Sequence, residues 1–155
     1  TICISGDGGL QMNIQELQTI VHYNLPIKLF VLNNNGYLTI KSTQQNHFGR
    51  FVGAEKSSGV TCPNIIKIAT AYGLPTATIA NTEELNVKID SILQTPGPIV
   101  CEIIMDENQP LIPRVSSLKK PDGTIISKPI EDLYPFLDRE EFFENMIVDP
   151  TEILK

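Results

Sequence analysis

Two short polar segments of this sequence, each directly after an apolar run, carry residues suited to chemistry. Residues 6–9 (Gly-Asp-Gly-Gly) follow the apolar run 1–5, and residues 33–36 (Asn-Asn-Asn-Gly) follow the run 27–32. Parallel strands joined by a helical crossover end at the same edge of a sheet, and open α/β sheets bind their ligands at that edge. We therefore expect Asp7 in the first segment to face Asn34 in the second.

The oxygen atoms of these segments suit a magnesium site. The carboxylate of Asp7, the carboxamide oxygen of Asn34 and the carbonyl of Gly36 are hard ligands, too few to enclose a metal by themselves. Because Mg²⁺ usually completes its octahedron with water and phosphate oxygens, a phosphorylated ligand is implied. Gly8 and Gly9 have no side chains to block close approach, and they lead into a helix N-terminus, which favours phosphate. We expect metal and diphosphate to share one site.

Both segments also have a purely structural interpretation. Acidic glycine turns are common in loops, and Asn and Gly tolerate left-handed backbone and cap helices with or without a metal. The functional interpretation is favoured here because Asp7 and the asparagines follow successive strands with one helical segment between them.

The same residues resemble the diphosphate-binding motif of thiamine-diphosphate enzymes, which runs from Gly-Asp-Gly to Asn-Asn. Three further segments, residues 11–17, 24–28 and 127–135, resemble the acetolactate synthase branch of that family and its synthase-like relatives. The likeness covers nearly the whole chain. It implies the thiamine-diphosphate-binding fold, with Asp7, Asn34 and the carbonyl of Gly36 as ligands of the metal.

The resemblance implies thiamine diphosphate and Mg²⁺ as cofactors. The cofactor-binding residues that it implies are Gly6, Asp7, Gly8, Gly9, Asn34, Gly36, Tyr37 and Leu38. The implied enzyme is a lyase or transferase that decarboxylates a 2-keto acid or related carbonyl, or makes or breaks a C–C bond, with the cofactor as electron sink. In this family, the groups that activate and bend the cofactor lie in a pyrimidine-binding domain and in a segment before Gly-Asp-Gly. Since this sequence has neither, we expect a fragment of a longer enzyme that is inactive alone.

The polar segment 43–59 has no clear periodicity, and we expect an active-site loop there. The resemblance places this loop beside the reactive ring of the cofactor, so that Lys41, Gln44 and His47 are candidates for substrate contact. For each of them, a position on a solvated surface loop is the alternative. The true synthases usually carry a tryptophan here, after a glutamine, whereas this chain has no tryptophan. That difference favours a synthase-like relative with another substrate.

Composition and charge exclude several classes of protein. The 155 residues suffice for a sizeable core, and the formal charge of −6 comes from the last 25 residues, which hold eight acidic and two basic side chains. No basic stripe matches nucleic-acid phosphates, and no apolar run is long enough to span a membrane. Three isolated cysteines form neither a disulfide framework nor a zinc site, which fits the cytoplasm. We expect Cys3 and Cys101 in the core.

The periodicity of apolar residues predicts an α/β fold with a doubly wound parallel sheet. The predicted strands are residues 1–5 (buried), 27–32, 76–79 and 98–105. The predicted helices are residues 10–24, residues 63–72 with Gly73 as the stop, and a helix that begins at Thr82; a short helix is also expected to begin within 37–41.

Two regions follow from this pattern. We expect a diphosphate- and Mg-binding α/β domain over residues 1–105. Residues 106–155 are expected to form an irregular, proline-rich, acidic C-terminal arm packed on the domain. It has a turn at residues 121–123 (Pro-Asp-Gly) and a last helix over 139–146.

The family builds its site between two subunits, so the resemblance implies a homodimer or homotetramer. Two other classes of function stay open at this point: a non-catalytic binding or regulatory α/β module, and another Mg-dependent phosphate-binding enzyme. Fold alone does not decide among them.

Overall fold

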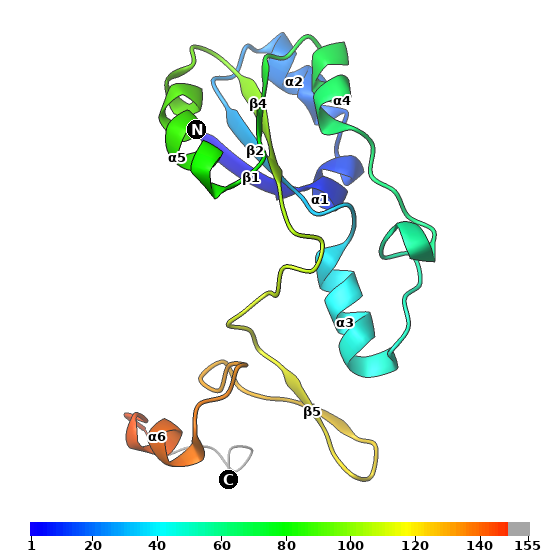
Figure 1. Ribbon diagram of the computed structural model, residues 1–155, viewed down its shortest axis with the longest axis vertical. Helices are drawn as coiled ribbons and strands as arrows, with labels where there is room; N and C mark the ends of the chain where they lie inside the picture. Colours follow the sequence, from blue (N-terminus) through cyan, green and yellow to red (C-terminus); the bar gives the residue numbers. More distant parts are fainter. Residues whose placement is uncertain (149–155) are drawn as a thin grey trace. The chain divides into compact units, whose positions relative to one another are not determined.

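The computed structural model describes residues 1–148 and divides into two compact units. The first unit is Thr1–Gln109, and the second begins at Pro110 (Figure 1). The boundary lies a few residues beyond the predicted one at 105, and residues 149–155 of the predicted arm lie outside the described residues. That the arm packs on the domain stays a prediction. No helix in the described part of the chain is long and apolar enough to cross a membrane.

The first unit contains a four-stranded sheet that confirms the predicted α/β fold. Its strands are all parallel and lie in the order β1-β2-β4-β3. Their bounds are β1 (Ile2–Gly6), β2 (Lys28–Asn33), β3 (Thr76–Ile79) and β4 (Ile99–Ile104). The register pairs Gly6 with Leu32, and Asn33 with Ile104. The segments that follow β1 and β2 therefore leave the sheet at the same edge.

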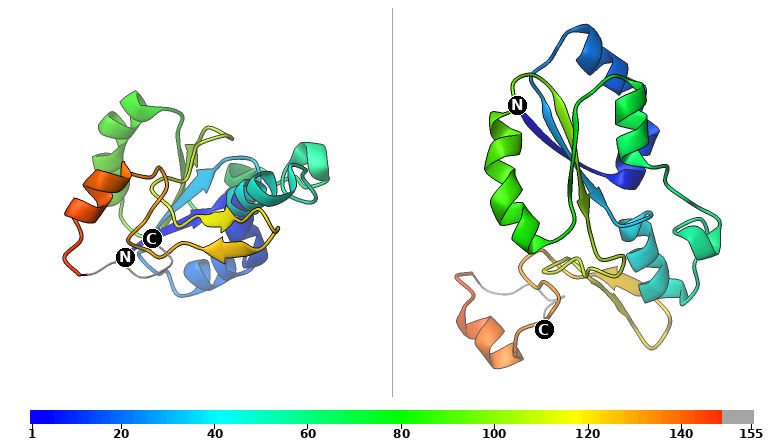
Figure 2. Two further views of the ribbon diagram at one scale, coloured as in Figure 1. Left: turned by 90° about the horizontal axis from the view of Figure 1, so that it is seen from below. Right: turned by 45° about the horizontal axis from the view of Figure 1, so that its top comes forward.

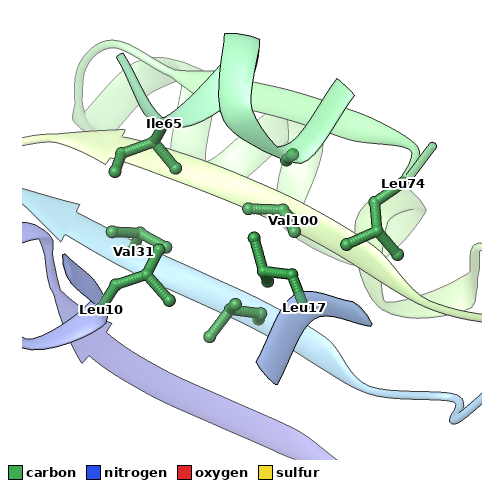
Figure 3. Close-up of a cluster of buried hydrophobic side chains, with 8 residues drawn as sticks. Leu10, Leu17, Val31, Ile65, Leu74 and Val100 are labelled. Carbon is green, nitrogen blue, oxygen red and sulfur yellow. The ribbon is translucent and has the colours of Figure 1, made fainter. Parts of the chain in front are cut away.

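Helices cover both faces of the sheet, as the doubly wound prediction requires (Figure 2). The helices α1 (Asp7–Met12), α2 (Glu16–His22) and α4 (Ile65–Ala71) pack on one face, and α5 (Thr82–Gln94) packs on the other. The first core consists of Leu10, Leu17, Leu29, Val31, Ile65, Ala69, Leu74 and Val100 (Figure 3). The second consists of Phe30, Ile79, Ile92, Ile99 and Cys101. Each fully buried large side chain contributes roughly 1.5–3 kcal/mol to folding.

The predicted helix over residues 10–24 is two helices, and α1 begins earlier, at Asp7. Between them the backbone forms a tighter turn, with hydrogen bonds between residues three positions apart. Asn13 N donates to the Leu10 carbonyl and Glu16 N donates to the Asn13 carbonyl, both at 3.0 Å. Such bonds replace the four-residue spacing of an α-helix. Leu10 and Leu17 still reach the same core from the two helices.

The prediction of a loop from residue 43 onward was wrong for its first part. The helix α3 spans Leu38–Phe48 and has no buried residue, so it lacks the apolar stripe that reveals a helix in a sequence. Gly49 follows it with a φ of 63°, a left-handed conformation that suits glycine at a helix end. Residues 49–64 are irregular except for the short 3-10 helix η1 (Lys56–Ser58).

The prediction that residues 1–5 are buried was also wrong. The side chains of Ile2 and Ile4 are 59% and 67% exposed, and Cys3 is exposed as well. The strand β1 lies at the edge of the described sheet, and neither Ile2 nor Ile4 belongs to the two clusters that pack beneath the helices. Cys101 lies on the central strand β4 and is buried, as predicted.

Local signals placed the starts of α4 and α5 well. Asn64 caps α4 by accepting a hydrogen bond from Lys67 N at 2.8 Å, so Pro63 precedes the cap and not the first turn. Asn81 caps α5 by accepting a hydrogen bond from Glu84 N at 2.9 Å. In return, the Glu84 carboxylate accepts a hydrogen bond from Ala80 N at 2.8 Å. Gly73, with a φ of 79°, ends α4 as predicted.

The second unit holds an antiparallel hairpin that the sequence did not suggest. Its strands are β5 (Ser117–Lys119) and β6 (Ile125–Ser127), and the predicted turn at residues 121–123 joins them. Within that turn the Asp122 carboxylate accepts from Thr124 N at 2.9 Å. The last helix, α6 (Arg139–Glu144), is shorter than the predicted 139–146.

A buried carboxylate organises the second unit. Asp132 is 1% exposed and accepts hydrogen bonds from Lys128 Nζ at 2.6 Å and from two guanidinium nitrogens of Arg139 at 3.0 and 3.1 Å. The Lys128 ammonium also lies 4.2 Å from the centre of the Phe136 ring. Burial alone would raise the pKa of Asp132, but the hydrogen bonds from Arg139 and Lys128 outweigh it and hold the pKa below its ordinary value.

We predict that the second unit loses stability in acid. Because the pKa of folded Asp132 is lowered, its contribution is complete above the unfolded pKa of about 4 and is lost as the pH falls through the lower folded value. Asp132→Asn should remove about 2 kcal/mol at neutral pH, since the three charge-assisted hydrogen bonds from Lys128 and Arg139 weaken or are lost. Hydrogen exchange of residues 128–142 against pH measures both effects. Unchanged exchange in the variant would contradict the prediction; Asp122→Asn, on the exposed turn, is the control.

Candidate functional site

Asp7 lies at the meeting point of the two polar segments. It is the first residue of α1, directly after β1, and its side chain is 1% exposed. Its Oδ2 accepts a hydrogen bond from Gly36 N at 2.9 Å, which confirms that the two strand ends meet. Its Oδ1 is buried and has no hydrogen-bond partner within residues 1–148. A buried oxygen left unpaired costs roughly 1–3 kcal/mol, so this atom is suited to a ligand.

The turn after β2 is held at both of its ends. Asn33 donates from Nδ2 to Glu102 Oε1 at 2.7 Å, and its Oδ1 accepts from Asn35 N at 3.0 Å. Asn35 has a φ of 61° and donates from Nδ2 to Glu107 Oε1 at 2.6 Å. Asn34 lies between these two anchored residues and is partly buried. Its orientation toward Asp7 stays a prediction.

Two glycines of the site are required by the packing of the protein itself. A Cβ atom on Gly8 would lie 2.6 Å from the ring of Tyr37, and one on Gly36 would lie 2.5 Å from the carbonyl oxygen of Ala54. The backbone N of Tyr37 donates to that same carbonyl at 2.9 Å. The space beside Gly8 is therefore filled by Tyr37, a packing reason for glycine that the sequence analysis did not identify. Leu38 follows as the first residue of α3.

Cys62 lies near Asp7, which the sequence did not reveal. Burial raises the pKa of its thiol to about 11, and the negative charge of Asp7 acts in the same direction. The thiol is therefore protonated at neutral pH and does not act as a thiolate. Cys62 helps to line a cavity of about 750 Å³. The other residues that line it are Asn35, Glu55, Lys56, Ser57, Thr61 and Glu107.

Two of the three candidate substrate residues are bound to the protein's own loops. Lys41 forms an ion pair with Glu55 at 2.6 Å and donates to Asn108 Oδ1 at 3.0 Å. The hydrogen bond from Lys41 also lowers the pKa of Glu55. Gln44 is paired twice with the backbone of Val52, donating at 2.9 Å and accepting at 2.8 Å. The contact with Lys41 holds Glu55, which lines the cavity, and direct contact of Lys41 or Gln44 with a substrate stays a prediction.

His47 lies near the end of α3, with its ring edge-to-face against Phe48 at 6.2 Å between centroids. It is partly buried. The structure does not bring it to Asp7 through any described contact, so its role as a substrate residue also stays a prediction.

The donor set suits a hard cation that keeps ligands of its own. Within the described residues, no three His, Cys, Asp or Glu side chains gather into a metal-binding cluster. The ligand set that the sequence predicts here, one carboxylate oxygen of Asp7, the carboxamide oxygen of Asn34 and the carbonyl of Gly36, stays a prediction. Such a set fits Mg²⁺, which is usually bound through one or two protein carboxylates, waters and substrate phosphates.

Sequence comparison relates the chain to one family. Residues 1–103 match the family described as thiamine pyrophosphate enzyme, C-terminal TPP binding domain. The acetolactate synthase large subunit of Porphyra purpurea is 35% identical over 130 residues, which are 83% of this chain and 22% of that protein. Acetolactate synthase 2 of Nicotiana tabacum chloroplasts is 32% identical over 119 residues, which are 74% of this chain and 18% of that protein. The chain thus spans about a fifth of the length of the curated relatives that it matches.

Structural comparison agrees with this relation. An X-ray structure from Mycobacterium smegmatis, described as a thiamin diphosphate-dependent enzyme, matches with a TM-score of 0.53 and 28% sequence identity. The match covers 68% of this chain and 18% of that one.

We predict that Gly36→Ala disrupts this edge of the sheet. The new methyl group would meet a backbone carbonyl, which cannot move aside as a flexible side chain can. Overpacking of this kind costs roughly 1–3 kcal/mol, which thermal unfolding measures. Gly6→Ala is the matched control, because its Cβ would meet nothing closer than 4.0 Å. Equal stability of the two variants would show that the close approach at Gly36 is unimportant.

Proposed function

We propose a function from one premise: this chain belongs to the thiamine pyrophosphate enzyme family and is the C-terminal TPP-binding domain of an acetolactate synthase-like protein. We propose that it binds thiamine diphosphate through Mg²⁺ at the edge of the sheet where β1 and β2 end. The observation that carries the magnesium site is the buried Oδ1 of Asp7, which has no hydrogen-bond partner among the described residues.

The metal would be held by Asp7 Oδ1, the Asn34 side-chain oxygen and the Gly36 carbonyl. Asp7 uses its other oxygen to accept from Gly36 N, so that one carboxylate serves both the protein backbone and the cation. A cation at Oδ1 would remove the cost of leaving this buried oxygen unpaired. Water and diphosphate oxygens would complete the coordination.

The diphosphate would lie against the first turns of two helices. Gly8 and Gly9 stand in the first turn of α1, next to Gly6 and Asp7, where backbone N–H groups have no partner inside the helix. Tyr37 and Leu38 stand at the start of α3, which begins at the same edge of the sheet. Backbone donors from both starts favour a doubly anionic group.

Bound thiamine diphosphate supplies an electron sink for the chemistry of a 2-keto acid or a related carbonyl compound, in a decarboxylation or in the making or breaking of a C–C bond. The residues of this chain hold and orient the cofactor, and the cavity beside Asp7 leaves room for a small substrate. Lys41 keeps one of the cavity's lining residues, Glu55, in place through their ion pair. The lack of tryptophan is our reason to propose a substrate other than that of the true synthases.

The partners that we propose follow from the same relation. A pyrimidine-binding domain, which this chain does not contain, would hold the other end of the cofactor. We propose a homodimeric or homotetrameric lyase or transferase of the cytoplasm. Its small-molecule substrate would enter at the cavity lined by Glu55 and Glu107.

We predict metal-dependent cofactor binding in the longest native polypeptide that contains this chain. Calorimetric titration of thiamine diphosphate should show binding with Mg²⁺ and little without it. Asp7→Ala and Asn34→Ala should each weaken this binding by about 100-fold or more, since each removes a ligand and loss of an outer partner alone costs 10- to 100-fold. Asp90→Ala removes an exposed carboxylate of α5 and should bind like the wild type. No binding by the wild type would leave a non-catalytic α/β module as the better interpretation.

A second prediction concerns the 155-residue chain by itself. It should show no turnover of a panel of 2-keto acids with thiamine diphosphate and Mg²⁺ present, because the groups that activate the cofactor are expected on the pyrimidine-binding domain. The longest native polypeptide, assayed in parallel, is the positive control. Turnover by the 155-residue chain at a comparable rate would contradict the prediction that the groups that activate the cofactor lie on the pyrimidine-binding domain.

A further inference from the structure

Glu102 is a buried carboxylate in the middle of the sheet. It lies on the central strand β4, is 7% exposed, and pairs in register with Val31 on β2 and Thr78 on β3. Among the ion pairs of the described residues, none includes Glu102. A buried charge of this kind is costly, and an apolar residue of similar volume usually serves stability as well or better. Stability therefore gives no reason for a carboxylate at this position.

The one described partner of its side chain is Asn33, the last residue of β2, where the turn begins. Glu102 Oε1 accepts a hydrogen bond from Asn33 Nδ2 at 2.7 Å, a length typical of a charge-assisted bond. That bond fixes the amide of Asn33, whose own oxygen accepts from Asn35 N at 3.0 Å. The next backbone nitrogen, that of Gly36, donates to Asp7 at 2.9 Å. Three hydrogen bonds and the covalent backbone between Asn35 and Gly36 thus connect β4 to Asp7 through this turn.

We propose that Glu102 is a positioning residue for the metal site: through Asn33 it holds the turn in the conformation that presents the Asn34 side chain and the Gly36 carbonyl to the cation. The inference rests on the proposed function, since it concerns the same magnesium site. Glu102 does not touch the metal in this arrangement. It acts as an outer partner that orients the ligands, a class of residue whose loss usually lowers metal affinity.

A positioning role and a purely structural role of Glu102 predict different effects of Glu102→Leu on metal affinity and on stability. Glu102→Leu replaces the buried charge by an apolar group of similar size, so the stability of the fold should be unchanged or higher. Asn33 is only partly buried, and water can satisfy its freed amide. The turn, however, loses its anchor on β4. Metal affinity should therefore fall although stability does not.

The test uses three variants of the longest native polypeptide that contains this chain. Glu102→Leu removes the acceptor, and Glu102→Gln keeps an acceptor oxygen without the charge. Lys28→Met is the matched control, because Lys28 is another buried charge, 8% exposed, whose ammonium donates to the carbonyls of Thr95 and Gly97. It lies at the other end of β2, roughly 16 Å along the strand from Asn33.

Two measurements are needed, calorimetric Mg²⁺-dependent binding of thiamine diphosphate and thermal unfolding without ligand. We expect Glu102→Leu to weaken binding by about 10- to 100-fold with no loss of thermal stability. Glu102→Gln should restore binding to within about fivefold of the wild type, since a neutral hydrogen bond is only modestly weaker. Lys28→Met should lower thermal stability, because the carbonyls of Thr95 and Gly97 lose the donor that Lys28 supplies, and it should leave the affinity unchanged.

Hydrogen exchange of the unliganded protein tests the positioning separately. Glu102→Leu should speed exchange of the Asn35 and Gly36 amides, because both depend on the geometry of the turn. Lys28→Met should not affect these two amides selectively.

The outcomes separate the two claims. If the wild type shows no metal-dependent binding, the proposed function fails. If the wild type binds and Glu102→Leu binds equally well, the positioning role is wrong. The positioning role is also wrong if the affinity falls only in proportion to the loss of stability, in Glu102→Leu and Lys28→Met alike. It is equally wrong if Glu102→Gln binds the cofactor no more tightly than Glu102→Leu.

Discussion

The hydrogen bond between the Asp7 carboxylate and the backbone N of Gly36 is the contact on which the candidate site depends. It joins the ends of β1 and β2, which are adjacent parallel strands, and buries the carboxylate at the start of α1. Since the bond uses only one oxygen, the other remains buried without a described partner. Folding of the sheet therefore creates an unsatisfied anionic atom at the edge where ligands of α/β proteins bind.

The surrounding loops restrict the freedom of this edge. Glu102 holds the turn after β2 through Asn33, and Glu107 holds it through Asn35. Lys41 joins α3 to the irregular segment that contains Glu55 and also to the chain beyond β4 at Asn108. Each of these contacts crosses between elements distant in sequence. Side chains fixed by such contacts keep a ligand site near its binding geometry before the ligand arrives, which reduces the ordering cost of binding.

Much of the first unit could be predicted because its signals are local. The turn residues after each strand, the Asn81 cap with Glu84, and Gly73 at the end of α4 all act within a few residues of their own position. The failures have one physical cause. Burial of Ile2 depends on how many strands flank β1, and α3 has no buried face that could mark its period. Neither the neighbours of a strand nor the surroundings of an exposed helix are present in local sequence.

The sequence by itself determined the types and order of the site residues: a glycine-flanked Asp7 after one strand and the asparagines after the next, which was enough to indicate a metal–diphosphate site and its family. Only the tertiary structure decided which of these groups already form hydrogen bonds or ion pairs within the protein. It pairs Asp7 with Gly36, Asn33 with Glu102 and Lys41 with Glu55, and it brings Cys62 near Asp7. The reason is that hydrogen bonds between strands and loops depend on the sheet order β1-β2-β4-β3. This order places residues up to about 70 positions apart side by side. No spacing along the chain encodes that order.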